Sequence, residues 1–224
     1  MNALDVFFNV DILWRTLPTL LTGLVNTILL GVTAIVCGSV IGVLVCLVRL
    51  YGPAPLRLLA IFYIDILRAM PILVVLILIY YALPFIGITF SSFAAAAIAL
   101  SAVFGAYAAE VVRAGIQAVP NGQFEAAAAL GLRFTTTLRL VVLPQAMRIV
   151  VPPHASNCVS IIKDTSLASV VATTDLLKQA TDAQALYANP TPLIGAALIY
   201  VAILWPLVRL TSWLEQHYQR SRAR

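Results

Sequence analysis

Charged residues are scarce in this sequence, and that scarcity excludes most classes of soluble protein. Lysine, arginine, aspartate and glutamate together make up 10% of the 224 residues, whereas hydrophobic residues make up 62%. A soluble domain usually carries about 25% charged residues. A soluble helical bundle would also need a polar face on each helix, and long stretches of this chain have none. The outer surface of the folded chain must therefore face lipid.

Motifs for nucleotide, metal and covalent chemistry are also missing from the sequence. It contains no phosphate-binding G-x4-G-K-[ST] segment, so this chain cannot hydrolyse ATP by that route. It has no nucleophile elbow, catalytic carboxylate pair or metal-ligand cluster. Cys37, Cys46 and Cys158 lie in apolar surroundings without ligand spacing, so we expect three free thiols buried in helices. We expect no catalytic residues, metal or cofactor in this chain.

Long apolar runs are abundant, and they predict an all-α polytopic membrane protein. A bilayer core about 30 Å thick needs about 20 helical residues to cross. Five runs are long enough, and we expect spans at about residues 22–48, 58–83, 92–112, 144–171 and 191–210.

The remaining segments define the predicted domain organisation. Residues 1–21 are expected to form an extracytoplasmic or interfacial segment, since Pro18 and Thr22 mark the early part of an apolar run that is longer than one crossing requires. Residues 22–213 form the transmembrane domain. A polar loop is expected at 172–190, and a basic cytoplasmic tail at 214–224.

The distribution of the 14 basic residues predicts the orientation. With five spans, only Arg15, Lys163 and Lys178 fall toward one side. The other eleven fall on or near the opposite side: Arg49, Arg57, Arg68, Arg113, Arg133, Arg139, Arg148, Arg209, Arg220, Arg222 and Arg224. Basic residues concentrate on the cytoplasmic side, so we expect the N-terminus outside and the C-terminus inside. The net charge of +5 therefore reflects topology and does not indicate nucleic-acid binding.

The segment between the third and fourth spans differs from the rest, because it is alanine-rich and carries charge. It predicts a short cytoplasmic helix at about residues 121–133, since alanine favours helix. Asn121 or its neighbours could cap its start, and Gly131 would allow the chain to turn at its end. The small alanine side chains would let a partner surface approach closely.

This segment also carries the most specific motif. The pattern is Glu125-Ala126-Ala127, three residues, Gly131, nine residues, Val141, one residue and Leu143-Pro144. It resembles the EAA loop of type I ABC importer permeases. Every spacing agrees, and the one departure is Val141 where the family pattern has isoleucine.

Further segments resemble the polar amino-acid branch of that family, which includes histidine, glutamine, arginine and opine permeases. They are 106–116, 143–146 and 163–167, together with Arg68-Ala69-Met70-Pro71 in place of Arg-Gly-Thr-Pro. The resemblance covers about residues 20–215.

The resemblance implies a permease subunit that moves a polar amino acid or an opine-like derivative across the bacterial cytoplasmic (inner) membrane. Two cytoplasmic ATPase subunits, which bind ATP and Mg, would dock on the Glu125–Gly131 helices. A second permease subunit and an extracytoplasmic solute-binding protein would complete the complex. Transport would proceed by alternating access, driven by ligands that favour one of two states.

Arg68 is the first candidate for the substrate pathway. It lies eleven residues past Arg57, about 16 Å along a helix and near the middle of the bilayer. A charge there is costly and needs a partner. Two hypotheses stand: Arg68 binds the substrate carboxylate, or it forms a structural ion pair with Asp65, three residues earlier on the same face.

The fourth span contains the other pathway candidates. Pro152 and Pro153 are expected to interrupt its hydrogen bonds, and His154 and Asn157 add polar groups near the midplane. Farther along the span, Lys163 and Asp164 form either a mutual pair that ends the helix or an outer gate.

Two features of the other spans are predicted to be structural. Glu110 and Arg113 are expected to form an i,i+3 ion pair. Gly38 and Gly42 have the spacing of close-packed membrane helices, but such pairs also arise by chance, so no prediction rests on them.

Two other classes of protein compete with this interpretation. A secondary transporter or channel would need its own ion site and no coupling helix, and a membrane enzyme would need a catalytic cluster that the sequence lacks. The sequence does not indicate which amino acid is moved, nor whether the second permease is a copy or a relative.

Overall fold

The computed structural model describes residues 7–222, and all the regular secondary structure in that range is helical. Four helices are long and apolar enough to cross a membrane, and a bent helix pair supplies a fifth span if it is counted as one. The predicted all-α polytopic fold is confirmed. Residues 1–6 of the predicted N-terminal segment and 223–224 of the basic tail lie outside the described residues, as do the side chains of Arg220 and Arg222.

Helix α2 (Val10–Tyr51) is continuous over 42 residues. Asn9 caps it by accepting a hydrogen bond from the Ile12 N–H at 3.1 Å. Pro18 lies inside the helix without ending it. The predicted boundary between residues 21 and 22 therefore falls within one element, although the division into domains itself stays a prediction. At 1.5 Å per residue the helix is about 63 Å long, more than one crossing needs.

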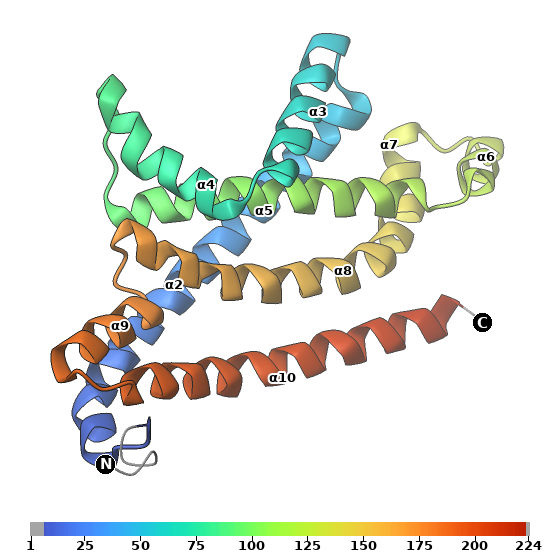
Figure 1. Ribbon diagram of the computed structural model, residues 1–224. Helices are drawn as coiled ribbons and strands as arrows, with labels where there is room; N and C mark the ends of the chain where they lie inside the picture. The colour runs from blue at the N-terminus through green and yellow to red at the C-terminus, as the bar shows by residue number, and fades with distance from the viewer. Residues whose placement is uncertain (1–6, 223–224) are drawn as a thin grey trace.

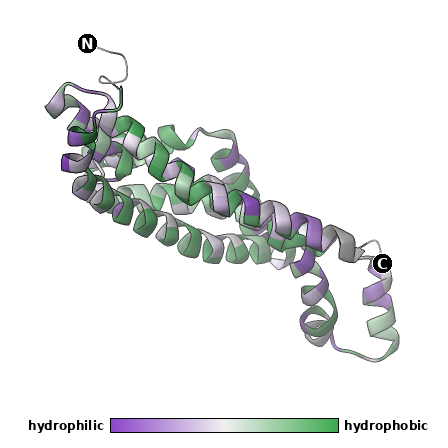
Figure 2. Ribbon diagram, turned by 90° about the horizontal axis from the view of Figure 1, so that it is seen from below, coloured by the Kyte–Doolittle hydropathy of each residue, from purple (hydrophilic) through white to green (hydrophobic). Residues whose placement is uncertain are grey.

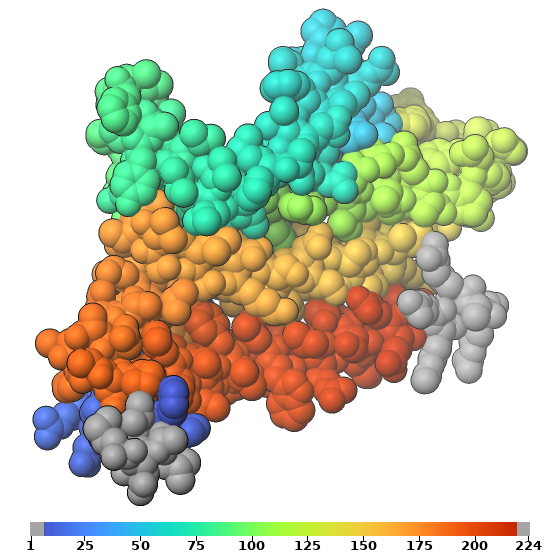
Figure 3. Space-filling model, in the orientation of Figure 1, coloured from blue at the N-terminus to red at the C-terminus, as the bar shows by residue number. Residues whose placement is uncertain are grey.

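The second predicted span is not one helix, and that expectation was wrong. α3 (Ala54–Ala69) is followed by α4 (Ile72–Ile77), π-helical η1 (Leu78–Ala82) and 3-10 helix η2 (Leu83–Ile86), with a bend of 108°. Pro71 causes the break, because it lacks an N–H and excludes Met70 from helical backbone angles. The two limbs diverge and leave a V-shaped hollow between them (Figure 3).

The central helix is α5 (Ser92–Gln117), the most buried of the candidate spans. It packs closely against α2 at small residues. A Cβ added to Gly42 would lie 2.5 Å from the Ala108 Cβ, and one added to Gly38 would lie 2.7 Å from a Phe104 ring carbon. These two glycines, on which no prediction rested, therefore set the distance between α2 and α5.

A hairpin of short elements joins α5 to the next span. It consists of α6 (Asn121–Ala129), α7 (Phe134–Thr137) and π-helical η3 (Leu138–Val142). The span itself is α8 (Leu143–Asp164), extended by 3-10 helix η4 (Thr165–Val171). Pro152 and Pro153 lack N–H donors, but α8 continues through both, so the expected break of the helix was wrong. The proline ring fixes φ at about −65°, a value that fits a helix, and α8 packs along α5 over this length.

The chain ends with α9 (Leu176–Tyr187) and α10 (Thr191–Arg222). α9 replaces the expected polar loop, because the Asp175 carboxylate caps it by accepting from the Lys178 N–H at 3.0 Å. α10 continues well past residue 210, where the last span was expected to end. α2 begins at the end of the bundle where α9 lies, and α10 ends at the other, the end that carries α6 and α7 (Figure 1).

The surface of the bundle agrees with a lipid environment. Many large apolar side chains are exposed along the spans, such as Val36 and Val40 on α2 and Leu198 and Val201 on α10. Hydrophilic residues gather toward the two ends (Figure 2). The middle of the molecule can therefore lie in hydrocarbon while both ends contact water.

Candidate functional site

The short helix α6 carries the predicted coupling residues and lies at one end of the bundle (Figure 1). It begins after Pro120, whose carbonyl accepts from the Gln123 N–H at 3.0 Å. Asn121 is the first helical residue, and no side chain caps the helix, so the predicted cap by Asn121 or its neighbours was wrong. The preceding proline already fixes an extended backbone at the cap position.

Gly131 ends α6 in the way the sequence predicts. Its φ is +72°, in the left-handed region that glycine adopts at low cost. Its N–H donates to the Ala128 carbonyl at 2.9 Å, and the Leu132 N–H donates to the Ala127 carbonyl at 3.0 Å. This pair of bonds is a Schellman motif, which satisfies carbonyls that the helix end leaves free. The chain therefore reverses sharply at Gly131 toward α7.

One face of α6 is anchored and the other is free. Ala127 is buried, and the Phe124 ring packs against a cluster that includes Val119 and Val142. Glu125 and Ala126 are exposed, and Leu130 is 80% exposed. A rigidly held helix with an exposed small-residue surface and a protruding leucine is suited to docking a second protein.

Leu143 and Pro144 connect this helix to the membrane span. They are the first two residues of α8, where the helix changes from π to α geometry and a missing proline N–H is tolerated. The next residue, Gln145, donates from Nε2 to the Gln123 side-chain oxygen at 3.1 Å and to the Val141 carbonyl at 3.0 Å. These bonds link α6 to the first turn of α8.

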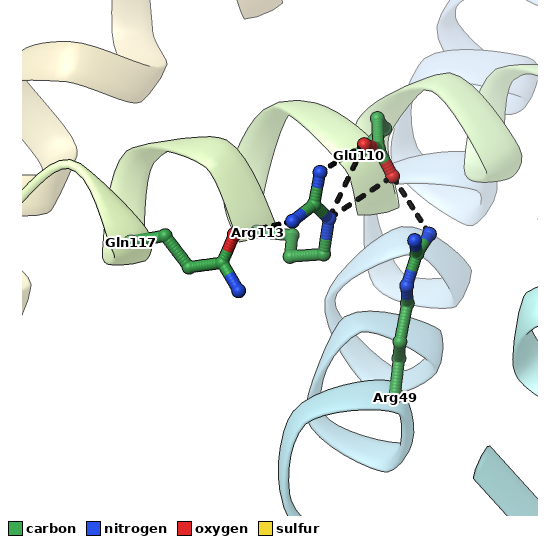
Figure 4. A network of polar contacts seen from close by, with 4 residues as sticks. All are labelled: Arg49, Glu110, Arg113 and Gln117. Atoms are coloured by element: carbon green, nitrogen blue, oxygen red, sulfur yellow. Dashed lines mark hydrogen bonds and ion pairs between the residues drawn. The ribbon is translucent and has the colours of Figure 1, made fainter.

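A charged cluster joins α2 and α5 near the same end (Figure 4). The structure contains the predicted pair of Glu110 and Arg113. Glu110 also accepts from Arg49 at 2.8 Å, and Arg113 contacts Gln117. The partner Arg49 was not predicted, because 61 residues separate it from Glu110.

Arg68 does not pair with Asp65, and the predicted ion pair was wrong. Both side chains are exposed, and no ion pair joins them in the described chain. The Arg68 guanidinium instead lies over the Tyr107 ring of α5, 5.7 Å from its centroid. Such a cation–π contact leaves the N–H donors of Arg68 available to a carboxylate.

Tyr107 also lines a cavity of about 260 Å³ between α4, α5 and α8. Asn157, Ser160 and Asp164 line it from α8, with spacings that bring them to one face of the helix. Asn157 and Asp164, both predicted to line the substrate pathway, therefore line the same cavity. Ser160 and Tyr107 were missed, although the i, i+3, i+7 pattern from Asn157 could have indicated Ser160.

The other predicted pathway residues lie elsewhere. His154 faces α2, where its Nε2 lies 3.2 Å from the Ser39 hydroxyl, and its ring packs against Phe104. Lys163 is exposed, and the described chain contains no ion pair between it and Asp164. Consecutive helical residues point in different directions, so the predicted mutual pair was wrong. No cluster of metal-ligating residues occurs among residues 7–222.

Comparison with known proteins decides the family. Residues 34–223 match the family described as binding-protein-dependent transport system inner membrane component. The chain belongs to this family. Its members are the membrane subunits of ABC transport systems, which work with ATPase and permease partners.

Individual members of the binding-protein-dependent transport family agree with this assignment. The chain is 39% identical over 176 residues to the probable amino-acid ABC transporter permease protein YckA of Bacillus subtilis, covering 79% of this chain and 78% of that protein. It is 36% identical to the L-cystine transport system permease protein TcyB of the same organism, covering 91% and 88%. The crystal structure of an amino acid ABC transporter with histidines superposes with a TM-score of 0.86 at 33% identity, covering 92% of this chain and 96% of that chain.

Proposed function

We propose that this chain is the permease subunit of an ABC importer for polar amino acids. The observation that carries the proposal is the exposed face of α6, anchored by Phe124 and linked through Gln145 to the first turn of α8. Two ATPase subunits bind ATP and Mg in the cytoplasm and dock on this face. The N-terminus is then outside and the C-terminus inside. The amino-acid transporters among its relatives support the substrate class.

The substrate path passes the cavity between α4, α5 and α8. A free amino acid carries a carboxylate and an ammonium group. Arg68, held beside Tyr107, binds the carboxylate through its fork of N–H donors, and Asp164 attracts the ammonium group. A second permease subunit, either a copy or a relative, covers the open side of the cavity, and a solute-binding protein delivers the amino acid.

Blocking the free face of α6 tests the docking step. Ala126→Trp adds bulk to this exposed face, and we expect the ATPase to be lost when the tagged permease is purified from membranes. Leu186→Trp is the matched control, because Leu186 is exposed on α9 at the far end of the molecule. If the ATPase copurifies equally with both variants, docking does not use α6.

Arg68→Lys tests the substrate path separately. Lysine keeps the positive charge but cannot form the two-point contact. We expect uptake to fall at least tenfold while the ATPase still copurifies. Normal uptake by this variant would exclude Arg68 as the carboxylate-binding group without affecting the proposal for α6.

A further inference from the structure

A second cavity lies between α8 and α10, two helices that run side by side, with α10 at the edge of the molecule (Figures 1 and 3). It has a volume of about 310 Å³. Its lining comes from α8 between Val151 and Ile162 and from α10 between Leu207 and Leu214, and it is almost wholly apolar. The Thr211 hydroxyl in this lining already donates to the Val208 carbonyl. We call this cavity the α8–α10 groove.

The groove faces away from the proposed substrate path. On a helix with 3.6 residues per turn, Val151, Ala155 and Ile162 share one face of α8. Asn157 and Asp164, which line the other cavity, lie on nearly the opposite face. The occupant of the groove is therefore not the transported solute.

The length of the groove matches one leaflet of a bilayer. From Val151 to Ile162 is eleven residues, or about 16 Å at 1.5 Å per residue. Half of a hydrocarbon core about 30 Å thick is about 15 Å. A neighbouring helix is about 10–12 Å across, so it could enter the groove only with its side chains. A single hydrocarbon chain fits the dimensions of the groove along its whole length.

The groove has a polar mouth at the end nearer α6. A separate hollow of about 350 Å³ lies there between the first turns of α8 and the end of α10. Gln145, Arg148 and Tyr218 line it, together with the junction of α5 and α6 at residues 118–120. Arg148 is exposed and has no hydrogen bond or ion pair within the described chain. An unpaired guanidinium beside an apolar groove complements an anionic headgroup attached to a hydrocarbon chain.

We propose that the α8–α10 groove and the polar hollow at its end together bind one acidic phospholipid. Its phosphate pairs with Arg148 at the mouth, and one acyl chain fills the α8–α10 groove. The bound lipid fills the space between α8 and α10, which belong to the two least buried of the long spans. Because the mouth includes the junction of α5 and α6, the lipid also touches the base of the coupling helix.

Native mass spectrometry of the full-length chain tests this proposal. The chain is exchanged into micelles that contain equal amounts of phosphatidylglycerol and phosphatidylcholine. We expect one phosphatidylglycerol per chain to be retained, at least tenfold more often than phosphatidylcholine. Excess inorganic phosphate should not displace it, since the acyl chain supplies part of the binding. Arg148→Gln should abolish the preference, whereas Arg57→Gln, at another exposed arginine, should keep it.

The groove is tested by filling it. Leu210→Trp places a ring in the α8–α10 groove from an exposed position on α10 and should abolish retention of both lipids. Leu198→Trp, at a similarly exposed position on α10 but outside the groove, should retain lipid like the parent chain. Ala155→Leu fills the groove from α8 and should act like Leu210→Trp.

Three results would overturn the proposal. The first is equal retention of the two lipids by the parent chain. The second is retention that survives both groove-filling changes. The third is a homodimer that dissociates in the Leu210→Trp variant while the bound lipid is unchanged. That result would mean that the groove binds a second copy of the chain.

Discussion

The Arg49 guanidinium at the end of α2 donates a hydrogen bond to the Glu110 carboxylate of α5 across 2.8 Å. Glu110 also pairs with Arg113, so one carboxylate neutralises two arginines from two helices (Figure 4). All three side chains are largely shielded. The cluster therefore joins the end of α2 to the helix that leads into α6.

Glu110→Gln should destabilise the protein more than Arg49→Gln. Loss of the carboxylate leaves two shielded arginines unpaired, and we expect the free energy of unfolding to fall by about 2 kcal/mol. Arg49→Gln leaves Glu110 still paired with Arg113 and should cost less. Thermal unfolding in detergent measures both. The opposite order would show that Arg113 alone does not satisfy Glu110.

Gly42→Ala should separate α2 from α5. The new Cβ would lie 2.5 Å from the Ala108 Cβ and 2.9 Å from the Gly105 carbonyl oxygen, so backbone must shift. Overpacking of this kind costs about 1–3 kcal/mol. Gly122→Ala is the control, because no atom lies within 4 Å of its added Cβ. Equal melting temperatures for the two variants would contradict the close approach.

Gly131→Ala should strain the end of the coupling helix. A residue with a Cβ pays about 1–2 kcal/mol in the left-handed region, whereas asparagine tolerates it better. We expect Gly131→Ala to lower ATP-driven uptake and Gly131→Asn to retain most of it. Uptake that is unchanged by alanine would show that the turn geometry is not needed.

Asp175 should make stability depend on pH. Burial raises the pKa of Asp175 from 3.8 to about 6, and its Oδ2 has no hydrogen-bond partner among the described residues. Between about pH 4 and pH 6 the folded chain keeps a proton that the unfolded chain releases, so stability falls as pH rises through that window. Above pH 6 the full penalty of about 3 kcal/mol remains.

Asp175→Asn isolates this effect, because asparagine also caps helices and cannot ionise. The variant should be more stable than the parent chain at pH 7 by up to about 3 kcal/mol, and the two should converge near pH 4. Unfolding measured across pH 4–8 checks this. A constant difference over the whole range would mean that Asp175 is already ionised at pH 4.

The sequence predicted those features that are local in the chain. Apolar runs located the spans, alanines and Gly131 located α6, and i,i+3 spacing located the pair of Glu110 and Arg113. These signals depend on neighbours within one or two helical turns.

Features that depend on distant residues escaped prediction. Nothing near Arg49 indicates Glu110, and nothing near Arg68 indicates that the Tyr107 ring would draw it away from Asp65. The bend at Pro71 was missed for another reason, because apolar residues dominate on both sides of it and hydropathy alone does not show a break. α9 was missed although Asp175, three residues before Lys178, is a capping signal within a polar stretch.

Reconstituted transport tests the central claim most directly. The permease is placed in proteoliposomes with its ATPase and binding protein, and uptake of labelled glutamine, arginine and histidine is followed with and without ATP. We predict that uptake of at least one of them requires ATP and stops when the ATPase is omitted. Uptake by the permease alone, without nucleotide or ATPase, would contradict the account.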